Sequence, residues 1–236
     1  MAVSDLIQKS TPFLEYLFDW QASQPAVRLA DVCATPEKTV ILSVDIINGF
    51  CYQGSLSSPR VKAIINPIID LFKRSWVLGV RDILLCQDTH DPKAVEFGQF
   101  PPHCVRGTYE AEAVPEIKNL PFYEFITQLE KNSISSTMGT GLDDWIVDHP
   151  EKETFIVVGD YTDLCIYQLG MFLRLDANDR MLKRRVVAPA NAIDTYDMPV
   201  EVARQIGAIP HPGDLLHVLF LYHMALNGIE VVRELS

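Results

Sequence analysis

The sequence predicts an α/β protein with three layers (α/β/α), in which helices cover both faces of a mostly parallel, doubly wound central sheet. Short apolar runs alternate along the chain with segments of helical periodicity, and this alternation is typical of parallel sheets. Two of the runs, Thr39–Asp45 and Asp82–Asp88, are almost continuously apolar and end in a carboxylate. Such runs are typical of central strands that are covered on both faces.

The remaining elements follow in the same alternating order. Apolar residues at Ile64, Ile65, Ile68 and Phe72 predict a helix within residues 61–78, between the first two strands. The further elements that we expect are a short edge strand near 122–126, a helix at 142–148, a strand at 155–158, a helix at 163–177, a strand at 185–188, helices near 199–205 and 214–225, and a last strand at 229–232.

Residues 1–38 precede the first strand of this pattern. Their apolar positions predict short amphipathic helical segments, with Pro12 marking a break or a helix start. We expect this segment to be an extension that packs on a single domain spanning residues 1–236.

Composition and charge narrow the class of function. The net charge of −11 argues against nucleic acid or an anionic membrane as a partner, because phosphate binding needs clustered Lys and Arg. The longest apolar runs have the length of strands, and the N-terminus lacks the pattern of a signal peptide. The five cysteines are odd in number and irregularly spaced, so we expect free thiols and a cytoplasmic protein.

The segment Gly159–Cys165 is a candidate nucleophile turn. It joins a buried strand to a helix that begins near Thr162, and it places Cys165 in the first helical turn. The positive end of a helix dipole favours a thiolate, and nearby N–H groups could bind an oxyanion. Taken alone, however, this segment favours Cys165 as a small buried apolar residue over a nucleophile, since free cysteines are usually buried.

Candidate partners for this thiol lie at other strand ends. Asp45 and Asp88 both end strands, and the carboxyl ends of parallel strands meet at one edge of the sheet. A carboxylate there must find polar partners, so Asp45 is a candidate base. Lys131, in contrast, would by itself be read as a solvated lysine.

A long connection at residues 89–119 carries the remaining polar candidates. Asp88 and His90, with His103 further along the loop, suit a divalent metal, although the histidines could also be ordinary loop residues. Cys86 and Cys104 are expected to be packing residues.

Four segments, 44–56, 88–108, 131–142 and 159–165, together resemble nicotinamidases, the pyrazinamidase/nicotinamidase group of the isochorismatase-like cysteine hydrolase superfamily. The tail is most similar to plant-type members. The resemblance implies metal-dependent hydrolysis of nicotinamide to nicotinate and ammonia through a thioester, and a homo-oligomer. It also implies one divalent ion, with zinc favoured over iron or manganese.

The resemblance also assigns roles to individual residues. It implies a catalytic triad of Asp45, Lys131 and Cys165, an oxyanion hole formed by the backbone N–H groups of Tyr161 and Cys165, aromatic contacts to the substrate from Phe50 and Phe100, metal ligands Asp88, His90 and His103, and Glu96 as a further ligand, directly or through water. The peptide bond between Asp160 and Tyr161 is expected to be cis.

The chain departs from the family at three places, and these leave the substrate open. Gly49 stands where many relatives have Asp, Met138 stands where some have an aromatic residue, and Asp160-Tyr161 replaces a small apolar pair. One alternative is a related cysteine amidohydrolase that acts on a ureido, carbamoyl or maleamate-like amide, and such enzymes usually lack the metal residues. Another is a non-catalytic binding protein, which should have lost Cys165 or Lys131.

Overall fold

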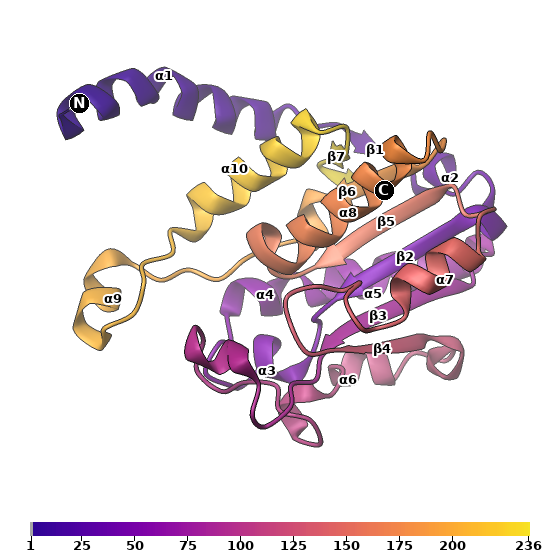
Figure 1. The fold of residues 1–236 in the computed structure, drawn as a ribbon. Coiled ribbons are helices and arrows are strands. Elements are labelled where there is room, and N and C mark those ends of the chain that lie inside the picture. The colour runs from indigo at the N-terminus through magenta and orange to yellow at the C-terminus, as the bar shows by residue number, and fades with distance from the viewer. Residues whose placement is uncertain (1) are drawn as a thin grey trace.

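A computed structural model describes residues 2–236 of the chain. Its centre is a six-stranded sheet in which every neighbouring pair of strands is parallel (Figure 1). This confirms the predicted fold class. The strands are β2 (Thr39–Val44), β3 (Asp82–Asp88), β4 (Thr127–Lys131), β5 (Thr154–Gly159), β6 (Arg185–Pro189) and β7 (Glu230–Val232).

The strand order explains where a site can form. Across the sheet the order is β4-β3-β2-β5-β6-β7, so the chain builds outward from β2 in one direction and from β5 in the other. The connections that leave the carboxyl ends of these two central strands therefore run in opposite directions along the sheet. In doubly wound sheets this switch point is where ligands bind.

Helices cover both faces of the sheet, because successive side chains of a strand point to opposite sides. Val40, Leu42 and Val44 of β2 join one apolar cluster, whereas Ile41 joins the other. One face carries α2 (Leu29–Val32), α4 (Pro59–Ala63), α5 (Ile65–Leu78) and α6 (Pro115–Lys118), and the other carries α7 (Leu142–Asp148), α8 (Tyr167–Asp179) and α10 (Gly213–Leu226).

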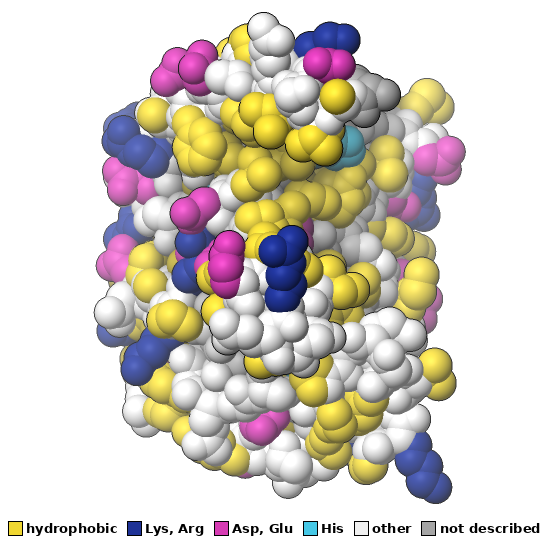
Figure 2. All heavy atoms as spheres, turned by 90° about the vertical axis from the view of Figure 1, so that its left-hand side faces the viewer, with side chains coloured by type: hydrophobic (Ala, Val, Ile, Leu, Met, Phe, Trp, Pro, Cys, Tyr) yellow, Lys and Arg dark blue, Asp and Glu magenta, His cyan; other side chains and the backbone are white. Residues whose placement is uncertain are grey.

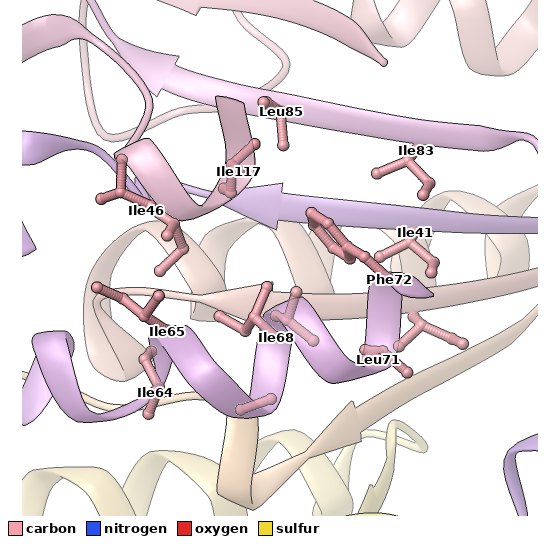
Figure 3. Packing of buried hydrophobic residues seen from close by; sticks show 14 of the residues in the cluster. Ile41, Ile46, Ile64, Ile65, Ile68, Leu71, Phe72, Ile83, Leu85 and Ile117 are labelled. Atoms are coloured by element: carbon pink, nitrogen blue, oxygen red, sulfur yellow. The ribbon is translucent and has the colours of Figure 1, made fainter. Parts of the chain in front are cut away.

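Helix α5 shows how the sequence pattern produces this packing. Ile68, Leu71 and Phe72 recur at helical spacing and lie against Ile41 and other side chains of the sheet (Figure 3). All four side chains are almost fully buried. Gly79 ends the helix in a left-handed conformation with φ of 103°, as glycine does at many helix C-termini.

The N-terminal segment differs from the expectation of short helical segments. It forms one continuous helix, α1 (Val3–Ala22), with Pro12 inside it. Proline is tolerated there because this part of the helix is exposed, so the freed carbonyl can reach water. Trp20 and Phe13 pack edge-on against Tyr222 of α10, whereas the first turns of α1 project beyond it (Figure 1).

A short parallel pair lies outside the main sheet. β1 (Ala26–Val27) pairs with β8 (Glu234–Leu235), so the residues after α1 are held against the C-terminus. Of the remaining helices, α3 (Asn48–Cys51) follows β2, and α9 (Val200–Ile206) lies apart from the sheet (Figure 1). None of the helices in residues 2–236 is both long and apolar enough to cross a membrane.

The prediction of a strand near residues 122–126 is wrong by one segment. Tyr123–Phe125 forms a 3₁₀ turn, and the strand is the more polar β4 that follows. The apolar side chains serve packing instead, since the Phe122 ring stacks on Trp76 of α5 at 4.4 Å between centroids. A strand at the sheet edge can remain polar because only part of it is covered.

Candidate active site

Four neighbouring strands deliver one polar residue each to the carboxyl edge of the sheet. Asp45 directly follows β2, Asp88 ends β3, Lys131 ends β4, and Cys165 lies in the turn after β5. The register sets Asp88 directly opposite Lys131 on the adjacent strand. The structure therefore brings together the three residues predicted as a triad and the first predicted metal ligand.

Lys131 is the centre of this cluster. Its ammonium lies 2.7 Å from the Asp45 carboxylate and 3.6 Å from the Cys165 sulfur, and it also forms an ion pair with Asp88. The side chain is fully buried, unlike a typical lysine. Burial opposes its charge, but the Asp45 and Asp88 carboxylates outweigh this and raise the pKa of Lys131. The lysine is thus a fixed cation that touches both carboxylates and the thiol.

The backbone at Asp45 turns its carboxylate inward. Its φ of 58° lies in the left-handed region, which is unusual for a residue other than glycine. One carboxylate oxygen accepts a hydrogen bond from the Asp88 backbone N–H at 2.7 Å. Burial and the neighbouring Asp88 charge raise the pKa of Asp45 to about 7, against the lowering effect of Lys131. A carboxyl group with this pKa can both accept and release a proton near neutral pH.

The turn after β5 depends on Gly159. Its φ is 116°, and a Cβ atom there would lie 2.0 Å from the Val44 carbonyl oxygen of β2. Only glycine fits such a close approach of two backbones. The next peptide bond, between Asp160 and Tyr161, is cis as expected, and a π-helical turn over Thr162–Ile166 then leads into α8.

Cys165 lies in that π-helical turn and is buried. Burial raises the pKa of its thiol well above the usual value, although Lys131 opposes this. This differs from the expectation of a helix-stabilised thiolate, because loss of water outweighs the favourable charge. A base is therefore needed to take the proton, and Asp45 shares the Lys131 ammonium with the thiol.

The backbone around the thiol offers hydrogen-bond donors. The Tyr161 carbonyl accepts bonds from the N–H groups of Leu164 and Ile166, which fixes the turn around Cys165. Within residues 2–236, the N–H of Tyr161 itself bonds to no backbone carbonyl. It is thus free to donate to another acceptor, which an oxyanion hole requires.

A second cluster, made of metal-type donors, lies beside the thiol. One ligand atom each from Asp88, His90 and His103 lie within 4.8 Å of one another, and all three residues are buried. In the part of the chain that the structure describes, neither ring nitrogen of His90 has a hydrogen-bond partner, although the side chain is completely buried. Buried polar atoms without partners are costly, so this donor set fits a metal ion that would satisfy them.

The histidines are held in orientations suited to ligation. His103 Nδ1 lies 2.8 Å from the Pro101 carbonyl oxygen, and because a carbonyl only accepts, this nitrogen carries the proton. Nε2 is then a free ligand atom that faces Asp88, as in many metal sites. Glu96 lines the adjacent pocket but does not belong to the three-residue donor cluster.

A small pocket opens directly onto these groups. It is lined mainly by apolar and aromatic side chains, together with the polar groups of Asp88, Glu96, His103 and Cys165. Both aromatic residues predicted to contact a substrate, Phe50 and Phe100, line it. A mainly apolar lining with a few converging polar groups suits a small molecule that carries a polar group.

Sequence comparison relates the part of the chain that carries these residues to a known protein family. The family described as "Isochorismatase domain" matches residues 39–199, which include every element that contributes to the cluster. The chain belongs to this isochorismatase-domain family. Over 216 residues it is 29% identical to "Nicotinamidase 1" of Arabidopsis thaliana, covering 83% of this chain and 86% of that protein.

Solved structures of other proteins share the fold at lower identity. The pyrazinamidase of Pyrococcus horikoshii in complex with zinc has a TM-score of 0.64 at 21% identity, over 83% of this chain and 99% of the other. N-carbamoylsarcosine amidase from Thermoplasma acidophilum has a TM-score of 0.60 at 20% identity, over 83% and 95%. Proteins with different named activities share this fold, so the fold alone does not identify a substrate class.

The structure also shows site residues that sequence reasoning missed. Leu56, Ile134 and Leu164 line the pocket, but as apolar residues in loops and turns they carried no distinguishing pattern. Asp160 is completely buried, and neither carboxylate oxygen has a hydrogen-bond partner among the described residues. Its position was noted only as a departure from the isochorismatase-domain pattern, and burial, followed by the nearby Asp45, raises its pKa well above the usual value.

Proposed function

We propose that this protein is a metal-dependent cysteine amidohydrolase that converts nicotinamide to nicotinate and ammonia. The observation that carries the proposal is the contact of one buried lysine with both Asp45 and Cys165, beside a pocket that also exposes metal-type donors. The similarity to a plant nicotinamidase supports a carboxamide as the substrate.

In the first half of the reaction, Asp45 takes the proton of the Cys165 thiol. Lys131 stabilises the sulfur anion as it forms, and the sulfur attacks the carboxamide carbon. The negative charge then develops on the carbonyl oxygen, which accepts hydrogen bonds from the N–H groups of Tyr161 and Cys165. Asp45 returns its proton to the nitrogen as the C–N bond breaks, so ammonia leaves and a thioester remains.

In the second half, water replaces ammonia at the same carbon. Asp45 removes a proton from the water, which attacks the thioester carbonyl, and the C–S bond breaks. The sulfur leaves with a proton, the acid product departs as its carboxylate, and the resting thiol is restored. A pKa of about 7 lets Asp45 act as base and acid in turn.

Asp88, His90 and His103 would hold a divalent ion, with Glu96 as a further ligand, directly or through water. Such an ion would offer a coordination position for the ring nitrogen of the substrate and so orient the ring. Zinc is the proposed metal, with iron or manganese as alternatives. Phe50 and Phe100 would contact the faces of the ring.

We further propose that the protein is a cytosolic, single-domain homo-oligomer. All five cysteines are unpaired and buried, in line with a reducing compartment. Helix α1 exposes Leu6, Ile7 and other apolar side chains, and Figure 2 shows apolar side chains gathered on the side from which α1 and α9 project. A second copy of the chain would cover such a surface.

Three measurements check these accompanying proposals. Sedimentation velocity should give an oligomer for the wild type and a smaller species for Leu6→Glu/Ile7→Glu, whereas a monomeric wild type contradicts self-association. Calorimetric unfolding in separate transitions for parts of one chain would contradict a single domain. Recovery of the tagged protein outside the cytosolic fraction would contradict the compartment.

Ammonia release tests the central proposal. Zinc-supplemented protein should hydrolyse nicotinamide faster than N-carbamoylsarcosine or maleamate, and Cys165→Ala should abolish the activity. Cys33→Ala is the matched control, because Cys33 is also buried but belongs to the core beside α2. Failure to hydrolyse any pyridine carboxamide would contradict the proposal, and preference for N-carbamoylsarcosine would favour the carbamoyl alternative.

A further inference from the structure

The side chain of Tyr161 forms part of the pocket wall, separately from the role of its backbone N–H. It lines the pocket together with Phe50 and Leu56, above Cys165. Only 4% of the residue is exposed, so nearly all of its surface is in contact with protein. A side chain at this place therefore decides how much room is left beside the nucleophile.

Tyr161 is held from the pocket side by two contacts. Its hydroxyl donates a hydrogen bond to the Leu56 carbonyl, which joins the turn after β5 to the loop after α3. Its ring meets Phe50 edge-on, with 5.2 Å between centroids and 70° between planes. One contact holds the hydroxyl of Tyr161 and the other holds its ring.

Further rings support Tyr161 from behind. The Tyr196 ring lies 5.0 Å from that of Tyr161, and the His211 ring stacks on Tyr196 at 3.7 Å. His211 is fixed in turn, since its Nε2 lies 2.8 Å from the Asp163 carboxylate and its Nδ1 lies 2.9 Å from the Tyr196 carbonyl. Asp163 and Cys165 lie in the same π-helical turn, so the contacts that fix His211 and Tyr196 begin and end at the nucleophile turn.

This arrangement prevents the tyrosine from swinging aside when a larger molecule enters. Movement of its ring would break the bond to Leu56 and separate it from Phe50 and Tyr196. Interiors packed in this way do not deform continuously, so the wall is expected to be rigid. A rigid wall beside a small pocket limits the substrate by size.

We infer that the Tyr161 side chain is a specificity-determining wall that restricts the site to carboxamides of a single flat ring and excludes fused bicyclic ones. The inference rests on the proposed amidohydrolase function and adds the size class of its substrate. Replacement of the ring by a small side chain removes the wall but keeps the backbone N–H.

The test compares the full-length, metal-supplemented wild type with Tyr161→Ala and Tyr161→Phe. The substrates are nicotinamide, quinoline-3-carboxamide and isoquinoline-4-carboxamide, which carry a second ring fused at different edges of the pyridine. For Tyr161→Ala, the ratio of kcat/KM for at least one bicyclic amide to that for nicotinamide should rise by about tenfold or more. Tyr161→Phe is the matched control, because it keeps the ring, and its ratio should stay within about threefold of the wild type.

A binding measurement keeps the test decisive if the alanine variant is slow or unstable. Calorimetric titration with the corresponding carboxylates is done on Tyr161→Ala and Tyr161→Leu, and tighter binding of a bicyclic acid than by the wild type is expected. Unchanged ratios together with unchanged binding would overturn the inference while leaving the nicotinamidase function intact. A wild type that hydrolyses bicyclic amides as well as nicotinamide would also overturn it, whereas a wild type without amidase activity would overturn the function as well.

Discussion

Replacement of Lys131 by methionine tests whether the buried ammonium holds the two carboxylates together. Methionine keeps the length of the side chain and removes the charge, so Asp45 and Asp88 would face each other in a buried site. At 2.7 Å and an effective dielectric constant near 20, the attraction between Lys131 and Asp45 is about 6 kcal/mol before desolvation is subtracted. Breaking a buried pair by removing one partner usually costs about 3–5 kcal/mol of unfolding free energy, and we expect a loss of this size.

The matched control is Lys38→Met at the surface. Lys38 also lies 2.7 Å from a carboxylate, that of Glu153, but both side chains are substantially exposed. Water and salt screen such a pair, so the same substitution at the same distance should cost only a small fraction of the loss at Lys131. Burial, and not distance, is the variable that differs between the two sites.

The stability loss of Lys131→Met should increase with pH. In Lys131→Met the carboxylates lose the cation that lowers their pKa values, so they bind protons more readily in the folded state. The loss of stability should therefore be smallest at pH 5 and largest at pH 8, where ionisation forces two buried negative charges together. Adding Asp45→Asn should recover part of the loss.

Urea unfolding followed by tryptophan fluorescence at pH 5, 7 and 8 measures these differences. Two results would refute the reasoning: equal losses for Lys131→Met and Lys38→Met at pH 8, or a loss at Lys131 that grows toward low pH. If Lys131→Met does not fold at pH 8, the double variant with Asp45→Asn and the measurement at pH 5 still decide between the alternatives.

Four further predictions follow from the same site. Cys165→Ser should lose at least about 10³-fold in kcat while its urea midpoint changes little, and substantial remaining turnover would count against a sulfur nucleophile. In the wild type, kcat/KM for nicotinamide should rise with pH through about 7 as Asp45 ionises, and a profile without that limb would remove Asp45 as the base. His90→Ala should bind much less zinc by elemental analysis after dialysis, and stoichiometric zinc in this variant would contradict the ligand assignment. Burial raises the pKa of Asp160, so the wild type loses folding stability as pH rises above about 4 and the unfolded carboxyl group ionises first. Asp160→Asn lacks this ionisation, so its stability relative to the wild type should rise by up to about 1.4 kcal/mol per pH unit. A constant difference across pH would show that Asp160 is not buried as a neutral acid.

The alternation of strands and helices was enough to predict the layers, because burial on both faces of a parallel sheet leaves continuous apolar runs. Asp45 and Asp88 could be placed at one edge for the same reason, since each ends such a run. The burial of Lys131 could not be predicted from its neighbours, because β4 is a polar edge strand. Its role came only from the family resemblance, and its contacts depend on strand register.

Two other differences have a similar origin in tertiary structure. Pro12 suggested a break, but α1 continues through it because its exposed backbone tolerates a missing bond. Apolar residues near Phe122 suggested a strand, but they pack on Trp76 instead. Both predictions are wrong because the surroundings that decide the outcome of a local pattern are set by distant parts of the chain.

Lys131 is the counter-ion of Asp45 and Asp88, and it lies on an edge strand that can separate from the sheet. β4 pairs with β3 on one side only, so it is the strand of this cluster most exposed to local opening. When it opens, the ammonium leaves with it, and Asp45 and Asp88 must take up a proton or repel each other. Separation of β4 from β3 is therefore linked to proton uptake by Asp45 and Asp88. A rising pH ionises Asp45 and, for the same reason, increases the free-energy cost of separating β4.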